Sequence, residues 1–427
     1  MHDIPLGAVP GPWLLIPFAL QLLGIALLPF LAHHWWERNY PKVSVVLGAV
    51  VAGYYLVALH EAPRVGDALH EYGSFLILMA SLFIVAGGIH LGVEGEATPL
   101  RNLLFLLGGA VLSNLIGTTG ASMLLIRPWI RMNRYRFTGF HAVFFIFLIS
   151  NVGGCLTPVG DPPLFLGFLK GVPFFWTLAH LWKPWLLALG LLGAVFFLMD
   201  RENFLRAPKA VRQEEAGEER FSVEGIGNLA PLVVILGAIF LPSPWREVVM
   251  AGAALCSWYL TPRLIHERND FSFAPIREVA WLFLGIFLTM IPALDLLGRL
   301  APELTRSFGM GPLHFYYATG LLSSVLDNAP TYLAFLSVDA GLKVGSLHNP
   351  ADILGIAMQT PANLMAISLG AVFFGAMTYI GNGPNFMVRS IVEGAGAKCP
   401  GFFGYIVTYA LPILLPVLAL AGWIFLR

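Results

Sequence analysis

Two aspartates lie in stretches of the chain where long apolar segments are interrupted by helix-breaking residues. Asp161 lies in a Gly-Asp-Pro-Pro run at 160–163, and Asp327 lies in a Leu-Asp-Asn-Ala-Pro run at 326–330. Glycine and proline interrupt the helical hydrogen-bond ladder and free backbone N–H and C=O groups. In hydrocarbon, freed groups and carboxylates must face protein, water or an ion. Each stretch is therefore a candidate site for a cation or a proton, and the alternative for each aspartate is a helix cap.

The pattern around Asp161 occurs a second time in the chain. Residues 154–165 align with 375–386 at an offset of 221, and five of the twelve positions are identical. A second polar break precedes each copy, at 113–120 and at 323–331, and Asn114 and Asn328 are 214 residues apart. These offsets pair Asp161 with Asn382, and Asp327 with Ser113. The sequence thus predicts two repeats, each with one carboxylate and one neutral oxygen ligand.

Composition places the chain in a membrane. Its 427 residues are 57% hydrophobic and 12% charged, whereas soluble proteins are about one-quarter charged. The net charge of zero gives no reason to expect a nucleic-acid partner, and three widely spaced cysteines form neither a disulfide framework nor a metal motif. No P-loop and no nucleophile–base pattern is present, so we expect neither an ATP-driven pump nor an enzyme. No cofactor is expected.

The hydrophobic segments predict the same plan in both halves of the chain. We expect helices at 13–32, 43–60 and 73–92, a polar-centred pair at 102–126, a broken helix at 137–170 and a helix at 173–199. The second half offers 229–241, 245–262, 278–297, a polar-centred pair at 313–337, a broken helix at 361–392 and a last helix at 402–426.

The segment at 102–126 decides the topology, because it either crosses the membrane once or folds back as a re-entrant hairpin. With a hairpin and the N-terminus outside, sixteen of the 25 Lys and Arg residues fall on the cytoplasmic side and eight outside. This bias favours the hairpin. Each half then crosses the membrane five times, so the second half is inverted relative to the first.

The predicted fold is therefore an all-α polytopic membrane protein with two inverted repeats, each containing a re-entrant hairpin and a broken transmembrane helix. The first repeat spans 1–199, with scaffold helices at 13–92 and transport elements at 102–199. A cytoplasmic connector follows at 200–228. The second repeat spans 229–427, with scaffold helices at 229–297 and transport elements at 313–427. We expect a multi-pass protein of the cell (inner) membrane.

Polar residues at the four breaks supply the oxygens that Na⁺ prefers. Asp161 and Asp327 are candidate Na⁺ ligands. Each other residue has an alternative as a packing hydrogen bond or a close helix contact. The complete set of candidate ion-binding residues is Ser113, Asn114, Thr118, Asn151, Gly153, Thr157, Asp161, Asp327, Asn328, Thr331, Thr378 and Asn382.

With these residues in hand, the chain resembles the ion transporter superfamily, which includes sodium–proton antiporters, arsenite permeases, P-protein relatives and citrate–dicarboxylate transporters. The resemblance is carried by the run at 150–163, which ends in Gly-Asp-Pro-Pro, and by the Asp-Asn-Ala-Pro-Thr run at 327–331. It implies a dimerising scaffold, a mobile transport domain and elevator-like alternating access. The chain departs from relatives in two places: Leu164 stands where arsenite permeases often carry asparagine, and neither hairpin has the Ser-Asn-Thr signature of the dicarboxylate branch.

We therefore expect a secondary active transporter, with Na⁺/H⁺ antiport as the leading function. Two acidic side chains stand at the breaks, without a Lys or Arg beside the inner turns to neutralise a multicarboxylate. The alternative is a Na⁺- or H⁺-coupled citrate or dicarboxylate transporter, because helix N-termini and a co-bound Na⁺ also hold anions. The expected partners are the lipid bilayer, small ions including Na⁺ as coupling ion or substrate, and a second copy of the chain in a homodimer.

Overall fold

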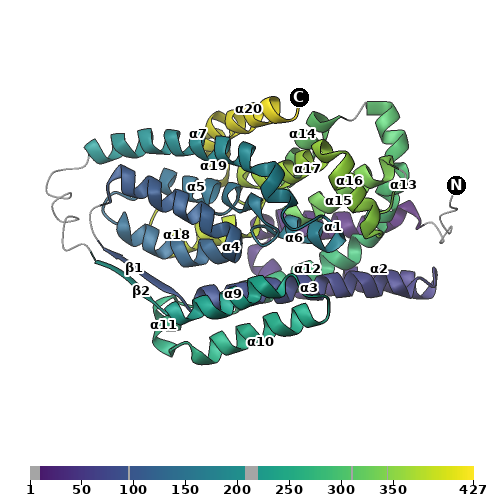
Figure 1. The fold of residues 1–427 in the computed structure, drawn as a ribbon, viewed down its shortest axis with the longest axis horizontal. Helices are drawn as coiled ribbons and strands as arrows, with labels where there is room; N and C mark the ends of the chain where they lie inside the picture. Colours follow the sequence, from purple (N-terminus) through teal and green to yellow (C-terminus); the bar gives the residue numbers. More distant parts are fainter. Residues whose placement is uncertain (1–9, 95–96, 207–219, 309–310, 344) are drawn as a thin grey trace.

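The structure is a computed structural model that describes residues 10–94, 97–206, 220–308, 311–343 and 345–427 (Figure 1). Within this part of the chain, seven helices are long and apolar enough to cross a membrane, or up to nine spans if each of two bent helix pairs is counted as one. The chain is therefore a multi-pass membrane protein built from helices, as the sequence predicts.

The first half begins with a short 3-10 helix and three long helices, and continues through the polar breaks. Its elements are η1 (Pro12–Leu14), α1 (Leu15–Leu31), α2 (His33–Val57), α3 (Ala62–Gly87), β1 (His90–Glu94), α4 (Pro99–Met132), α5 (Gly139–Leu148), η2 (Val152–Leu156), α6 (Pro162–Lys170) and α7 (Trp176–Arg206).

The second half repeats this order with additional short helices. Its elements are β2 (Arg220–Glu224), η3 (Ile226–Asn228), α9 (Leu229–Ala238), α10 (Trp245–Leu260), α11 (Arg263–Arg268), α12 (Ala274–Thr289), α13 (Ile291–Phe308), α14 (Pro312–Ser323), α15 (Asn328–Leu342), α16 (Pro350–Gln359), α17 (Pro361–Phe374), η4 (Gly375–Met377), α18 (Gly383–Gly394), α19 (Phe402–Tyr405), η5 (Ile406–Leu414) and α20 (Leu415–Phe425).

Helix α4 is a hairpin rather than a straight rod. Gly117 interrupts it with φ 77° and ψ 154°, a conformation that favours glycine. The rings of Phe105 and Trp129 are stacked with their centroids 5.4 Å apart, and the Asn102 amide donates to Asn133 at 2.8 Å. Residues 24 apart on one straight helix would be separated by about 36 Å. The two arms therefore lie side by side, which confirms the hairpin geometry expected at 102–126.

The other three breaks also match the prediction. Helices α14 and α15 form the second hairpin, in which the rings of Phe315 and Phe335 approach to 6.3 Å. The first broken helix consists of α5, η2 and α6, and the second of α17, η4 and α18. Asp161 and Asn382 occupy the N-cap positions of α6 and α18, each preceding a proline in the first turn. The offset of 221 thus pairs equivalent positions.

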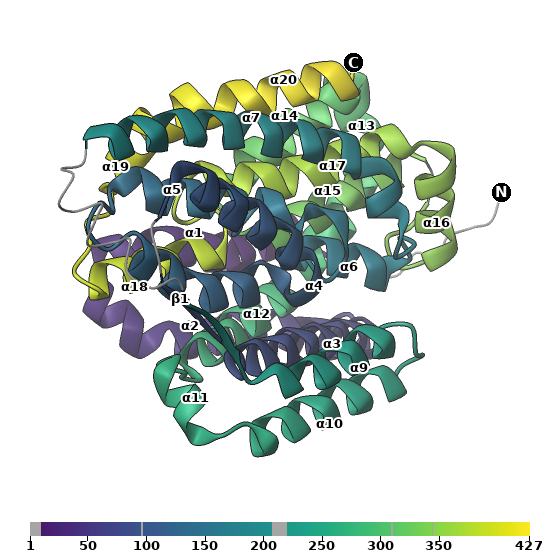
Figure 2. The same ribbon diagram turned by 60° about the vertical axis from the view of Figure 1, so that its left-hand side comes forward.

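Contacts between the halves follow the pattern of a two-fold axis. Helix α2 packs against α12, and its counterpart α10 packs against α3. Half-helix α6 packs against the second hairpin through α15, and α18 packs against the first hairpin through α4. Figures 1 and 2 both show α9 and α10 on one side of the molecule and α7 and α20 on the opposite side, with α4, α6 and α18 between them. The fold is therefore a pair of inverted repeats whose transport elements interlock.

The structure contains elements that the sequence reading did not anticipate. Strands β1 and β2 pair antiparallel, with His90 opposite Glu224, and tie the two halves together. Helix α3 starts at Ala62 rather than near residue 73. The hydrophobic pattern missed the first turns of the helix because they are polar and carry charged side chains. Helix α7 continues to Arg206, so the connector is shorter than 200–228; residues 207–219 of it lie outside the described part. The predicted domain boundaries otherwise stay a prediction.

Candidate functional site

Asp161 lies at the point where the two repeats meet. Its Oδ1 accepts hydrogen bonds from the Thr118 hydroxyl at 2.9 Å and from the Asn382 amide at 3.2 Å. Its Oδ2 accepts from the Asn328 amide at 3.0 Å. The Asp161 side chain is only 1% exposed. The carboxylate is thus satisfied by neutral donors, and within the described chain none of its hydrogen-bond partners is a Lys, Arg or His.

The three donors come from three different breaks. Thr118 begins the second arm of the α4 hairpin, directly after Gly117. Asn328 begins α15, directly after the turn of the second hairpin, and Asn382 caps α18. The N-termini of two half-helices, α6 and α18, converge here. Because helix N-termini carry partial positive charge, the site can stabilise an anion as well as the Asp161 carboxylate.

Two glycines let the hairpin tips reach the broken helices. A Cβ on Gly154 would lie 2.5 Å from Thr118 Cγ2, and a Cβ on Gly375 would lie 2.4 Å from Asn328 Oδ1. These glycines are 221 residues apart and serve equivalent contacts in the two repeats. By these contacts, Thr118 and Asn328 are equivalent positions in the two repeats, and their offset is 210.

That pairing corrects the assignment of Asp327. The sequence offset of 214 placed Asp327 opposite Ser113, but the structural offset of 210 places it opposite Gly117 at the break of α4. Asp327 caps α15 by accepting from the Ala329 N–H at 3.0 Å. Thr331 donates to the Asp327 carbonyl at 3.0 Å. Asp327 is half-buried and is the N-cap of α15. It directly precedes Asn328, which donates a hydrogen bond to Asp161.

Several predicted residues shape the broken helices instead of touching Asp161. The Asn114 amide donates to the Gly153 carbonyl at 2.7 Å, and its Oδ1 accepts from the Leu156 N–H. Ser113 donates to the Ile149 carbonyl, and Thr157 donates to the Asn114 carbonyl. Thr378 donates to the Ser324 carbonyl at 2.6 Å, which repeats the Thr157 contact in the second half. These bonds satisfy backbone groups that the breaks release.

An asparagine network links the two broken helices beside Asp161. The Asn151 amide donates to Asn385 Oδ1 at 2.7 Å, and the Asn382 amide also lies 3.2 Å from Asn151 Oδ1. Asn385 in turn donates to the carbonyls of Gly375 and Thr378. Asn385 was not in the predicted set. Its counterpart at the repeat offset is the apolar Leu164, so the repeat alone gave no signal for it.

The same residues can surround a cation. Rotating an Asn side chain by 180° about its last bond exchanges amide nitrogen and oxygen. Turned this way, Asn328 and Asn382 would present oxygens beside the Asp161 carboxylate and the Thr118 hydroxyl. Such an all-oxygen set suits a hard ion such as Na⁺. Among the described residues no group of three or more His, Cys, Asp and Glu side chains could hold a metal ion, so the donor set does not fit a transition metal.

A second buried polar cluster stabilises the base of the first hairpin. The Asp200 carboxylate accepts from the Asn102 amide at 2.8 Å and from Arg136, and it lies 3.1 Å from His141 Nε2. Asn133, from the other arm of α4, bonds to Asn102. The Asp200 and His141 side chains are fully buried. This cluster joins both arms of the hairpin to α5 and α7.

Comparison with known proteins identifies the chain's relatives. A family model described as "Putative citrate transport" matches residues 8–426. A "46 kDa membrane protein" of Mycobacterium leprae is 28% identical over 348 residues, which cover 77% of each chain. An "Uncharacterized transporter" of Mycobacterium tuberculosis is 24% identical over 385 residues, 83% of this chain and 86% of the relative. Another from Synechocystis is 24% identical over 302 residues, covering 64% and 65%.

The family match extends over nearly the whole chain and includes both repeats, both hairpins and Asp161 with its three donors. It confirms the resemblance to the ion transporter superfamily that the Gly-Asp-Pro-Pro run indicated, and the relatives from Mycobacterium tuberculosis and Synechocystis are named as transporters. The chain is a membrane transporter and belongs to the putative citrate transport family.

Proposed function

We propose that this chain is a secondary active transporter that moves a small carboxylate anion of the citrate class together with a cation or proton held at Asp161. The observation that carries the proposal is the buried Asp161 carboxylate, which accepts hydrogen bonds from donors in both repeats. The family description supplies the substrate class.

Electrostatics gives the reason for coupling. An ionised Asp161 repels an incoming carboxylate, and within about 4 Å that repulsion is several kcal/mol at the effective dielectric of a protein site. A proton or Na⁺ bound at Asp161 removes the repulsion. The N-termini of α6 and α18 then stabilise the anion. Cation binding therefore precedes anion binding, and the two travel in the same direction.

Na⁺/H⁺ antiport is the second candidate function. It is supported by the same three donors, because Thr118, Asn328 and Asn382, which bond to Asp161, carry no positive charge. In that mechanism Na⁺ and H⁺ compete for Asp161 and no organic anion enters. The two functions therefore differ in whether citrate moves, and both require Asp161.

Alternating access is proposed to follow an elevator motion of the hairpins and broken helices against the scaffold. Ion pairs bridge the two groups of elements at both ends. Lys170 at the end of α6 bonds to Glu71 of α3 at 2.5 Å, and Arg127 of α4 pairs with Asp270 after α11 at 3.3 Å. Such pairs would break and re-form as the elements slide. The homodimer surface is proposed to lie on the scaffold helices at 13–92 and 229–297.

Transport assays in liposomes test the function. Purified protein is reconstituted, and uptake of radiolabelled citrate is measured with an inward proton gradient, an inward Na⁺ gradient or neither. We expect gradient-driven citrate uptake that is lost in Asp161→Asn and retained in Asp67→Asn, an exposed aspartate on α3. If citrate stays outside while Na⁺ drives proton efflux through the same protein, antiport is the function. Unchanged citrate uptake by Asp161→Asn would remove Asp161 from the mechanism.

Cysteine labelling tests the proposed topology, with the N-terminus outside and the connector cytoplasmic. Single cysteines replace Arg131, Arg212 or Arg299 in a background in which the three native cysteines are changed to serine. A membrane-impermeant maleimide added to intact cells should label position 299 and spare 131 and 212. The reverse pattern would reject the orientation.

A further inference from the structure

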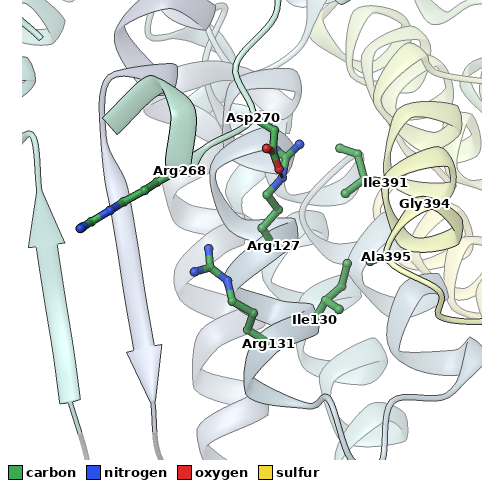
Figure 3. Close-up of a pocket in the computed structure, with 8 residues that line it drawn as sticks. All are labelled: Arg127, Ile130, Arg131, Arg268, Asp270, Ile391, Gly394 and Ala395. Carbon is green, nitrogen blue, oxygen red and sulfur yellow. Dashed lines mark ion pairs between the residues drawn. The ribbon is translucent and has the colours of Figure 1, made fainter. Parts of the chain in front are cut away.

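A cavity of about 370 Å³ lies between α4 and α18, among the transport elements, and the end of α11 in the scaffold (Figure 3). Its volume is within the range of small-molecule sites, about 300–1,000 Å³. Residues that line it include Arg127, Ile130 and Arg131 from α4, Asp270 after α11, and Ile391 and Gly394 from α18.

The cavity is connected to the central site by two helix segments. The second arm of α4 begins at Thr118, and α18 begins after its cap Asn382; both of these residues bond to Asp161. The two segments pack against each other, and their C-terminal ends line the cavity. From Thr118 to Arg127 the helix rises about 14 Å. A ligand in the cavity therefore lies at the far end of the α4–α18 pair that leads to Asp161.

The cavity contains guanidinium groups that an anion can reach. Arg127 and Arg131 are four residues apart and share one face of α4. Arg127 pairs with Asp270 at 3.3 Å, and the Asp270 side chain is 76% exposed. In the described part of the chain, Arg131 forms no ion pair. Arg268 extends away from the other two arginines, and its guanidinium bonds to Glu224 (Figure 3).

The pair formed by Arg127 and Asp270 is easily exchanged. The Arg127 side chain is 21% exposed and the Asp270 side chain 76%, so water competes mainly for the carboxylate, and such a partly exposed pair contributes on the order of 1 kcal/mol. An external carboxylate can displace Asp270 at little cost and gain Arg131 as a second partner. Guanidinium groups bind carboxylates through two parallel hydrogen bonds, which makes two neighbouring arginines selective for such groups.

We propose that this cavity is a vestibule site that binds the carboxylate substrate on its way to or from Asp161, with Asp270 occupying the position of the substrate when it is absent. The identity of the ligand rests on the proposed function. Ile130 and Ile391 form the apolar wall against which the carbon chain of a small polycarboxylate packs. The vestibule concentrates the anion beside the α4–α18 pair, and the anion moves on to the central site only after the coupling cation is bound at Asp161.

Site-resolved chemical modification tests the proposal on the full chain in detergent. Phenylglyoxal modifies accessible arginines, and mass spectrometry reports the rate at each position. Arg134 is the matched control, because it is exposed on the same end of the first hairpin but does not line the cavity. With citrate at about one to four times its dissociation constant, we expect modification of Arg131 to slow roughly two- to fivefold and modification of Arg134 to stay unchanged.

Two variants sharpen the test. Asp270→Asn removes the competing carboxylate and should lower the citrate concentration needed for half-maximal protection of Arg131; Asn also tolerates the left-handed φ of 44° at this position. Arg127→Gln should raise that concentration. Protection of Arg131 should persist in Asp161→Asn, which separates the vestibule from the central site.

Three outcomes would overturn the proposal. Equal slowing at Arg131 and Arg134 would mean ionic screening. Protection by inorganic phosphate or phosphatidylglycerol micelles, without protection by citrate, would assign the cavity to phosphate groups or lipid. Loss of protection in Asp161→Asn would place citrate at the central site alone. Protection of Arg131 without citrate uptake in liposomes would retain the anion site and reject the proposed transport function.

Discussion

Replacing Asp161 separates the structural role of its carboxylate from its charge. In Asp161→Asn, the new amide oxygen can keep the position that accepts from Thr118 and Asn382. The new NH₂ group then faces the Asn328 amide, which donates in the wild type. One rotation of the Asn328 side chain resolves this conflict by turning its oxygen toward residue 161.

The rotation has a ready partner on the other side of Asn328. Ser323 lies 2.6 Å from both Asn328 Oδ1 and the Ala371 carbonyl. After the rotation, Ser323 donates to the carbonyl and accepts from the Asn328 NH₂, so every group remains paired. A neutral hydrogen bond contributes about 1 ± 0.5 kcal/mol. We therefore expect the free energy of unfolding of Asp161→Asn to lie within about 1 kcal/mol of the wild-type value.

Asp161→Leu should behave differently because it leaves two buried donors, the Thr118 hydroxyl and the Asn328 amide, without an acceptor. The Asn382 amide keeps the Ser150 carbonyl and Asn151 Oδ1 as acceptors. Each unsatisfied group costs about 1–3 kcal/mol, so the loss is at least about 2 kcal/mol. Thermal unfolding in detergent distinguishes the two variants, and uptake in liposomes should be abolished in both. A third variant, Asp161→Asn with Asn328→Asp, moves the carboxylate to the neighbouring position and should restore part of the cation dependence.

Equal stabilities of Asp161→Asn and Asp161→Leu would show that the Asn328 rotation does not occur. Transport by Asp161→Asn with the cation dependence of the wild type would show that the carboxylate does not bind the coupling ion. In that case the carboxylate is a helix cap for α6, and the coupling ion binds elsewhere.

Two further substitutions test the packing around the site. Gly154→Ala places a Cβ 2.5 Å from the Thr118 side chain and should cost about 1–3 kcal/mol and reduce uptake, whereas Gly190→Ala, with open space around it, should leave both unchanged. Asp200→Asn removes the negative charge that pairs with the buried Arg136 guanidinium and should lower the free energy of unfolding by about 3–5 kcal/mol. Glu202→Gln, on the exposed surface of α7, should change it by less than about 1 kcal/mol. Thermal unfolding in detergent measures all four, and equal losses in a variant and its control would contradict the assignment.

The broken helices were predictable because glycine and proline act locally. The Gly-Asp-Pro-Pro run marks the N-terminus of α6 without reference to any distant residue. The repeat offset then identified Asn382 as the equivalent cap, and the structure places it on Asp161. Local chemistry and internal symmetry together were sufficient to predict that Asp161 and Asn382 are equivalent residues at the centre of the candidate site.

The hairpins were harder to align because the number of residues between the hairpin tip and the broken helix differs between the two repeats. The offset is 221 between the broken helices but 210 between Thr118 and Asn328 at the hairpin tips. Aligning Asn114 with Asn328 was off by four residues, about one helical turn. A shift of one turn keeps polar residues on the same helix face, so the sequence pattern could not reveal the error. The contacts of the hairpins with the broken helices fix the alignment: Gly154 and Gly375 face Thr118 and Asn328, and Thr157 and Thr378 donate to the carbonyls of Asn114 and Ser324, all at an offset of 210 between the hairpins.

Apart from the contact of Asp161 with Asn382, the long-range polar pairings could not be read from the sequence. Asn385 pairs with Asn151 across 234 residues, and Asp200 joins Arg136 and His141 at the base of the first hairpin. Asp200 was placed at the start of the charged connector because charged residues follow it. The chain continues as helix, and the carboxylate is buried because Arg136 and His141 compensate its loss of hydration.

The symmetry of the fold and the asymmetry of the site have a common explanation. Asp161 and Asn382 are equivalent caps, and the two-fold relation brings them within 3.2 Å of each other. Two aspartates at this distance would repel unless one carried a proton, and two asparagines would leave no charge to couple. One aspartate beside one asparagine gives a single carboxylate with a built-in donor, and that donor can turn its oxygen inward when a cation arrives. Under the proposed mechanism, the difference between Asp161 and Asn382 therefore gives the two-fold scaffold a site for one cation.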